Sequence, residues 1–192
     1  MKIAITGSIG SGKSLVGSYL RSLGYAVIDT DKLVHEFYHS SNILYQPVVD
    51  VFGLDILDDA GEIDRKKLGQ RVFGDALDLN DLESIVHPAV ADFIQTYHEQ
   101  GQIVFFEVPM LFESEMNEYF DSVLMIDVDK ELSLERLVLR GISREDALLR
   151  LNHQMDPKLK IEKSSNVIHN NSSIEDLYRN IDAYLEGLGG EA

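Results

Sequence analysis

Five short apolar stretches recur along the chain, and segments in which apolar residues follow helical spacing lie between them. Near-continuous apolar strands that alternate with helices are typical of a parallel sheet covered by helices on both faces. A sheet of this kind binds its ligands at the carboxyl ends of its strands. We therefore predict a three-layer α/β fold with a five-stranded parallel sheet. The predicted strands are Ile3 to Thr6, Ala26 to Asp29, Ile103 to Val108, Val123 to Asp127 and Asn166 to Ile168.

Two insertions interrupt the alternation of strands and helices. More than seventy residues separate the second strand from the third, far more than a crossover needs, and they predict a helical insertion over residues 32–86. Residues 137–163 are rich in Arg, Glu and Lys, and we expect them to form a helical lid. The rest is the core of a single domain, with the ranges 1–31, 87–136 and 164–192.

Helix boundaries are predicted from apolar spacing and from residues that cap or break helices. The first insertion predicts helices at Lys32 to Tyr38, Gln46 to Phe52, Arg65 to Phe73 and Leu79 to Val86. Pro88 is expected at the first position of a new helix, because its missing N–H costs nothing there. In the lid, Ser143 and Asp146 predict a capping box. The last helix is expected to start at Ile174 and to end at Gly187.

The residues directly after the first strand, Gly7 to Ser14, match the pattern GxxxxGKS. Glycines let such a loop turn tightly, so that successive N–H groups converge on phosphate oxygens, and the following helix adds the positive end of its dipole. Lys13 is expected to reach the β- and γ-phosphates, and Ser14 to offer its hydroxyl to Mg²⁺. Because a strand precedes the loop and a helix that Gly24 ends follows it, the loop predicts a nucleoside triphosphate site in a P-loop NTPase-type fold.

Two aspartates follow the second strand. Asp31 stands where an acceptor hydroxyl can be brought opposite the γ-phosphate, and a carboxylate there can take the proton of that hydroxyl. The alternative is that both aspartates cap the next helix. We assign Asp31 as the base or hydroxyl-orienting residue and Asp29 as a structural or cap residue.

The segment His35 to His39 formally matches HExxH, a pattern that binds zinc on a helix. No third ligand follows at a metalloprotease spacing. We therefore expect an amphipathic helix in which Val34, Phe37 and Tyr38 pack.

Three more residues are candidates for the site. Glu107 ends the third strand and is either a holder of a water on Mg²⁺ or an ordinary strand-end carboxylate. His87, beside Pro88 at the predicted junction of two helices, is expected to cap, pack or contact a ligand phosphate. Arg140 lies at the start of the lid, where closure would set its guanidinium against the transferring phosphate and remove water.

Arg136 and Arg144 could do the same as Arg140, and charged residues in such a run are usually solvated helix surface. Basic residues matter here because the formal net charge is −16, so acidic side chains far outnumber the cations that could bind an anionic ligand. Free nucleic acid and anionic membranes need a basic face, so we expect neither as a partner. A polyanionic substrate must instead be held by a few well-placed cations.

The chain contains no cysteine, which excludes disulfides, thiolate metal sites and cysteine nucleophiles. No signal peptide is recognisable, and no apolar stretch approaches the ~20 residues of a membrane span. We expect a cytoplasmic protein, either a monomer or a small homo-oligomer.

Over nearly its full length the chain resembles the dephospho-coenzyme A kinase family. The resemblance rests on an ordered set of motifs, which are Ile5 to Ser14, Val27 to Asp31, Ile63 to Leu68 with Val72-Phe73, His87-Pro88, Val108-Pro109 with Leu111 to Glu113, and Val167 to Asn171. It implies ATP-dependent phosphorylation of the 3′-hydroxyl of the dephospho-coenzyme A ribose, with Mg²⁺ required. In the family the large insertion binds the coenzyme A precursor.

The resemblance also implies roles for single residues. Asp31 matches the proposed general base, and Lys13 and Arg140 match the stabilisers of transition-state charge. From the residues themselves, we assign Asp31 and His87 to the acceptor, and Ser14 and Glu107 to the metal. The ATP-binding residues are then Gly7, Gly10, Ser11, Gly12, Lys13, Ser14 and Leu15. The chain departs from the family in having Ser8 for glycine, Leu15 for a hydroxyl residue, and Glu107, Asn166 and His169 for the aspartates often found there.

Two other functions compete with this one. A kinase for another small molecule or for a nucleoside monophosphate would share the loop and the lid, but the large insertion and His87-Pro88 favour the coenzyme A precursor. A guanine-nucleotide switch would need an Asn-Lys-x-Asp motif, and the sequence has none.

Overall fold

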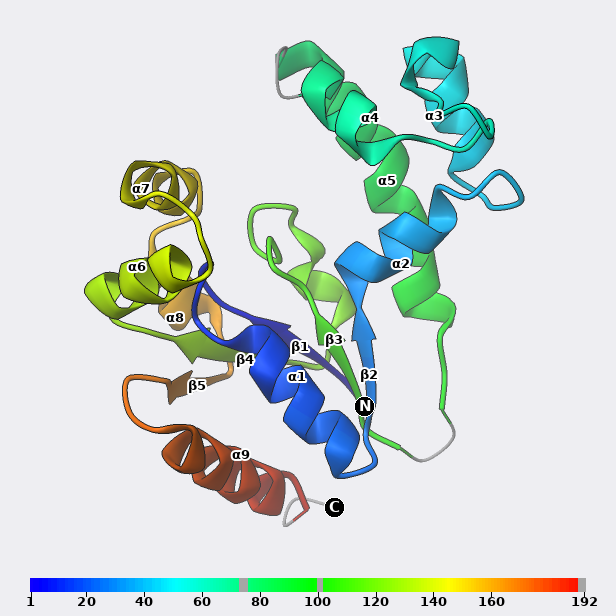
Figure 1. Ribbon diagram of the computed structural model, residues 1–192. Helices are drawn as coiled ribbons and strands as arrows, with labels where there is room; N and C mark the ends of the chain where they lie inside the picture. Colours follow the sequence, from blue (N-terminus) through cyan, green and yellow to red (C-terminus); the bar gives the residue numbers. More distant parts are fainter. Residues whose placement is uncertain (73–75, 100–101, 190–192) are drawn as a thin grey trace. The chain divides into compact units, whose positions relative to one another are not determined.

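The computed structural model describes residues 1–72, 76–99 and 102–189 (Figure 1). The chain divides into two compact units. The first, here called the core unit, combines residues 1–28 and 99–192, and the second, the helical unit, is residues 29–98. The predicted insertion 32–86 falls inside the helical unit.

The core unit is built on one parallel sheet. Within the described residues its strand order is β2-β3-β1-β4-β5. The central strand β1 pairs with β3, where Ile3 lies beside Phe105, and with β4, where Ile5 lies beside Leu124. The strands are β1 (Lys2–Thr6), β2 (Ala26–Asp29), β3 (Val104–Glu107), β4 (Ser122–Asp127) and β5 (Asn166–His169). The fold class and all five predicted strands are confirmed, because no strand end is displaced by more than one residue.

Helices cover the sheet of the core unit. They are α1 (Lys13–Ser22), η2 (Met116–Tyr119), α6 (Lys130–Leu139), α7 (Arg144–Asn152), α8 (Pro157–Lys163) and α9 (Ile174–Gly189). Helices α1 and α9 lie side by side (Figure 1). The rings of Tyr19 and Tyr178 stack between them, with their centroids 3.9 Å apart. Strand residues of one parity face these two helices and form the main apolar cluster with them.

Helix α9 is longer than predicted. It continues through Gly187 to Gly189. The reason lies in packing, since Leu185 and Leu188 on either side of that glycine contact the main apolar cluster. This burial outweighs the low helix propensity of a single glycine. The predicted cap in the lid is present, because the Ser143 hydroxyl accepts the Asp146 N–H at 3.1 Å.

The helical unit has an apolar cluster of its own. Its elements are α2 (Thr30–Phe37), α3 (Tyr45–Phe52), η1 (Leu54–Ile56), α4 (Arg65–Val72) and α5 (Ala76–Thr96). Phe37 and Tyr38 are buried in this cluster and Val34 packs against it, as expected for an amphipathic segment. Within the described residues no three His, Asp or Glu side chains gather into a metal-binding group. The predicted end of α4 at Phe73 falls outside the described residues.

Helix α5 corrects the prediction of two helices joined at His87-Pro88. It runs unbroken from Ala76 to Thr96, with Pro88 inside it. Proline in a helix interior removes the hydrogen bond to the carbonyl four residues earlier, here that of Ser84. Apolar side chains on both sides of Pro88, among them Ile85 and Phe93, pack into the same cluster and hold the helix together.

No helix of the described residues is long and apolar enough to cross a membrane.

Candidate active site

The loop between β1 and α1 needs its glycines. Gly7, Gly10 and Gly12 have φ values of 151°, 81° and 102°, which L side chains rarely adopt. A Cβ on Gly7 would lie 2.2 Å from the Ile126 carbonyl oxygen, and one on Gly12 would lie 2.5 Å from Nδ2 of Asn170. Substitution at either position therefore meets both an unfavourable backbone angle and an occupied space.

The Lys13 side chain is hydrogen-bonded to carbonyl groups of the loop itself. Its ammonium donates to the carbonyl oxygens of Gly7, at 2.6 Å, and of Ser8, at 3.1 Å. Helix α1 begins at Lys13, so the first N–H groups of the helix and the dipole end lie at the loop. This strand, loop and helix arrangement is the one that the GxxxxGKS pattern predicts.

Three side chains that sequence reasoning did not single out hold the loop from outside. Ser133 on α6 donates its hydroxyl to the Ile9 carbonyl at 2.6 Å. Gln154, which follows α7, accepts the Ile9 N–H at 2.9 Å through Oε1. Asn170, just after β5, donates from Nδ2 to the Ser11 carbonyl at 2.7 Å. These residues lie more than 120 positions from the loop, and only Asn170 falls in a motif that the sequence displayed.

The three lid arginines differ in their partners. Arg136 donates to the Asn170 carbonyl at 2.9 Å, and burial together with the nearby Arg140 charge lowers its pKa. Its Nη1 is buried without a hydrogen-bond partner in the described part of the chain. Arg144 pairs with Glu131 at 2.6 Å. Arg140 is exposed and has neither an ion pair nor a hydrogen bond from its side chain to another described residue.

Glu107 lies at the end of β3, where the sequence placed it, and is 4% exposed. Its Oε1 accepts from the Arg21 guanidinium at 3.1 Å. The same carboxylate lies against Gly17 of α1, where a Cβ would come within 2.1 Å of Oε1. Glu107 is thus fixed beside the helix that starts at the loop, and Ser14 in the first turn of that helix is exposed.

Asp31 and His87 belong to the helical unit. The Asp29 carboxylate accepts the N–H groups of Asp31 at 3.1 Å and of Lys32 at 3.2 Å, which confirms Asp29 as the cap of α2. Asp31 lies in the first turn of α2 with its side chain exposed. His87 is half-buried in the middle of α5, a helix that packs against α2.

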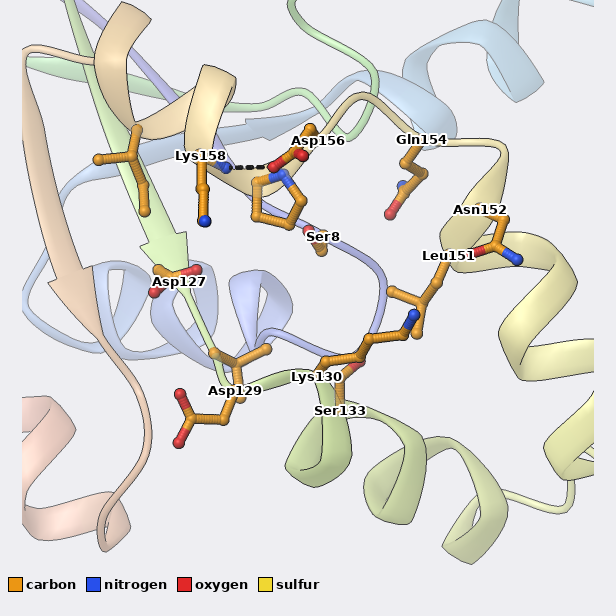
Figure 2. Close-up of a pocket in the computed structure, with 13 residues that line it drawn as sticks. Ser8, Asp127, Asp129, Lys130, Ser133, Leu151, Asn152, Gln154, Asp156 and Lys158 are labelled. Atoms are coloured by element: carbon orange, nitrogen blue, oxygen red, sulfur yellow. Dashed lines mark hydrogen bonds between the residues drawn. The ribbon is translucent and has the colours of Figure 1, made fainter.

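A cavity of about 640 Å³ lies in the core unit between the loop and the lid residues (Figure 2). On one side it is lined by Ser8, by the end of β4 and by the start of α6; on the other side lie residues 151–161. The side chains of Asp127 and Lys158 face it, and Gln154 stands at its edge (Figure 2). Ser8 of the glycine loop is therefore a wall residue of this cavity.

Comparison with known proteins extends beyond the loop. The family model of dephospho-CoA kinase, CoaE, matches residues 1–176. A dephospho-CoA kinase of Fusobacterium nucleatum is 36% identical over 191 residues, covering 98% of both chains. A crystal structure from Thermus thermophilus aligns with a TM-score of 0.83 and 34% identity over 98% of this chain and 97% of that one. The dephospho-CoA kinase from Campylobacter jejuni aligns with a TM-score of 0.74 and 31% identity over 100% of both chains.

Proposed function

The chain belongs to the dephospho-CoA kinase family, and from that premise we propose that it transfers the γ-phosphoryl group of ATP to the 3′-hydroxyl of the dephospho-CoA ribose. The products are CoA and ADP. The observation that carries this proposal is the glycine loop with Lys13 at the start of α1, set in a chain that matches the family over residues 1–176. The loop holds the donor, and the family match names the acceptor.

In the proposed reaction the 3′-oxygen attacks the γ-phosphorus as the bond from that phosphorus to the β,γ-bridging oxygen breaks. Asp31 accepts the proton of the attacking hydroxyl, because its exposed carboxylate follows the second strand at the position of the family base. His87 binds the same acceptor from α5. The remaining ATP-binding residues supply N–H groups of the loop and of the first turn of α1 to the phosphates.

In the proposed reaction two cationic side chains stabilise the negative charge that spreads over the oxygens of the transferring phosphoryl group. Lys13 exchanges the carbonyls of Gly7 and Ser8 for β- and γ-phosphate oxygens when ATP enters. Arg140 supplies the second cation when the lid, residues 137–163, closes. The contacts favour Arg140 over its neighbours, since Asn170 engages Arg136 and Glu131 engages Arg144.

Ser14 and Glu107 are the residues proposed to hold Mg²⁺. Hydroxyl and carboxylate oxygens are the ligands that this ion prefers, so the donor set fits. Glu107, paired with Arg21 and packed on Gly17, is fixed in place and suits a contact through a water. When bound, the ion neutralises charge between the β- and γ-phosphates. We also include a cytoplasmic location and a monomer or small homo-oligomer in the proposal.

The test is purified protein with ATP and Mg²⁺ and a panel of acceptors, followed by ADP release and by mass spectrometry of the product. We expect ADP release with dephospho-CoA and a product that is heavier by one phosphoryl group. Shikimate, adenosine monophosphate and an acceptor-free sample serve as controls. The proposal fails if dephospho-CoA releases no more ADP than the acceptor-free sample, and an active control acceptor would then redirect it to another small-molecule kinase.

A further inference from the structure

Ile9, near the middle of the glycine loop, is held at three points. Its side chain packs against the apolar cluster that α6 and α7 form around Leu134 and Leu137. Its carbonyl accepts the hydroxyl of Ser133 at 2.6 Å. Its N–H donates to Oε1 of Gln154 at 2.9 Å. Side chain, carbonyl and N–H are therefore all bound by residues that follow β4 in the sequence.

The segment that carries Gln154 is itself anchored. The next residue, Met155, donates its N–H to Oε1 of Glu113 at 2.9 Å. The same Glu113 oxygen pairs at 2.6 Å with Lys160, whose side chain is fully buried. These contacts fix the backbone at Gln154 against the loop that follows β3. These contacts thus fix the segment from which the Gln154 carboxamide oxygen accepts the Ile9 N–H.

The anchor at Ile9 matters because glycines surround it. Gly7, Gly10 and Gly12 give the loop many accessible conformations, and only some of them point the N–H groups at one set of phosphate oxygens. Ile9 does not belong to the proposed ATP-binding residues, so its N–H is available for a structural bond. A bond from the lid segment to this N–H selects a loop conformation without competing with the triphosphate.

We propose that Gln154 is a positioning residue, which holds the triphosphate loop in its ATP-binding conformation from the lid side. This proposal rests on the proposed ATP site in the loop. In this proposal Gln154 acts through its bond to the Ile9 backbone and not on a reacting atom. Loss of the bond should therefore weaken ATP binding more than acceptor binding.

The test compares Gln154→Leu with Asn152→Leu, two changes from amide to leucine on one segment. Asn152 lines the same cavity as Gln154, and in the described part of the chain no hydrogen bond joins it to the loop, so it serves as the matched control. For Gln154→Leu we expect KM for ATP to rise about 3- to 10-fold, the effect of one neutral hydrogen bond, with KM for dephospho-CoA unchanged. The Ile9 amide of the free protein should exchange its hydrogen faster in Gln154→Leu than in Asn152→Leu, as followed by NMR.

A third variant separates positioning from general loss of structure. Gln154→Glu keeps an oxygen at the same reach, so the Ile9 amide should remain protected from exchange in the free protein. The proposal is overturned if Gln154→Leu leaves both KM for ATP and Ile9 exchange unchanged, if Asn152→Leu changes them equally, or if Gln154→Glu exchanges as fast as Gln154→Leu. The exchange experiment and calorimetric ATP binding need no acceptor, so they give a result even if dephospho-CoA is not the substrate.

Discussion

Asp31 and Arg140 carry opposite charges and serve opposite partners in the proposed transfer, the attacking hydroxyl and the phosphoryl group. Asp31→Asn removes the proton acceptor, and we expect it to lower kcat by about 10²- to 10⁴-fold.

Arg140→Met removes a cation that acts on transition-state charge, and we expect a loss of about 10²- to 10³-fold in kcat and in kcat/KM. Steady-state kinetics measure both, and calorimetry should show ATP binding that is nearly unchanged.

Both variants have matched controls in the chain. Asp29→Asn makes the same change two positions away, and it should keep wild-type kcat because asparagine caps a helix as well as aspartate does. Arg144→Met breaks only an exposed ion pair with Glu131, so kcat should again stay at the wild-type value. If Arg144→Met slowed turnover as much as Arg140→Met, the assignment of the catalytic arginine would be wrong.

At the level of elements, the sequence predicted the sheet well, because each strand is a short apolar run and the segments between the strands show helical spacing of apolar residues. The helix after the loop also ends as expected, with Gly24 at a φ of 91°. The errors fall where tertiary packing overrides a local breaker. Pro88 was predicted to begin a helix and Gly187 to end one. Instead, side chains on both sides of each residue are anchored in an apolar cluster, and the helix runs on through it.

The candidate site was predictable to the extent that its chemistry lies in contiguous motifs. Gly7 to Ser14 and the strand-end residue Glu107 were predicted in this way. Ser133 and Gln154 were not, because a serine inside a helix and a glutamine after one carry no local signal. Their roles arise from contacts across 124 and 145 residues, which only the fold creates.

The anchor of the lid segment gives a prediction about stability. Glu113→Gln leaves the fully buried Lys160 without its ion partner, and loss of one member of a buried pair costs about 3 kcal/mol in the free energy of unfolding. Lys160→Met should cost less, because Glu113 keeps the Met155 N–H and some contact with water. Urea unfolding of the three proteins at pH 7 measures the order, and an equal or reversed order would contradict it.

The contribution of the same pair to the free energy of unfolding depends on pH in a defined direction. Burial raises the pKa of Glu113, but the Lys160 ammonium and backbone N–H groups, that of Met155 among them, together outweigh it and leave this pKa below its ordinary value. A carboxyl group with a lowered pKa stabilises the folded state above its unfolded pKa of about 4.3 and loses that effect as the pH falls through the folded value. The difference in unfolding free energy between wild type and Glu113→Gln should therefore shrink below that pH.

On the scale of the whole molecule, the dominant property is charge, with 33 acidic against 17 basic side chains. Ion pairs such as Arg144–Glu131 and Arg179–Asp176 are exposed and contribute little. An excess of one sign on a compact chain is self-repulsive and lowers its stability. Salt screens this repulsion, since the Debye length falls to about 10 Å at 0.1 M.

We therefore expect Tm at pH 7 to rise as NaCl increases from about 0.01 M to about 0.5 M, because screening acts mainly between carboxylates that outnumber their partners. Differential scanning calorimetry without Mg²⁺ or nucleotide measures the shift, and choline chloride should reproduce it if screening rather than Na⁺ binding is the cause. Near the sequence pI of 4.6 the net charge vanishes, and the dependence on salt should vanish with it. A fall of Tm with salt at pH 7 would mean that attraction within the ion pairs outweighs repulsion between the unpaired carboxylates, and the self-repulsion account would be wrong.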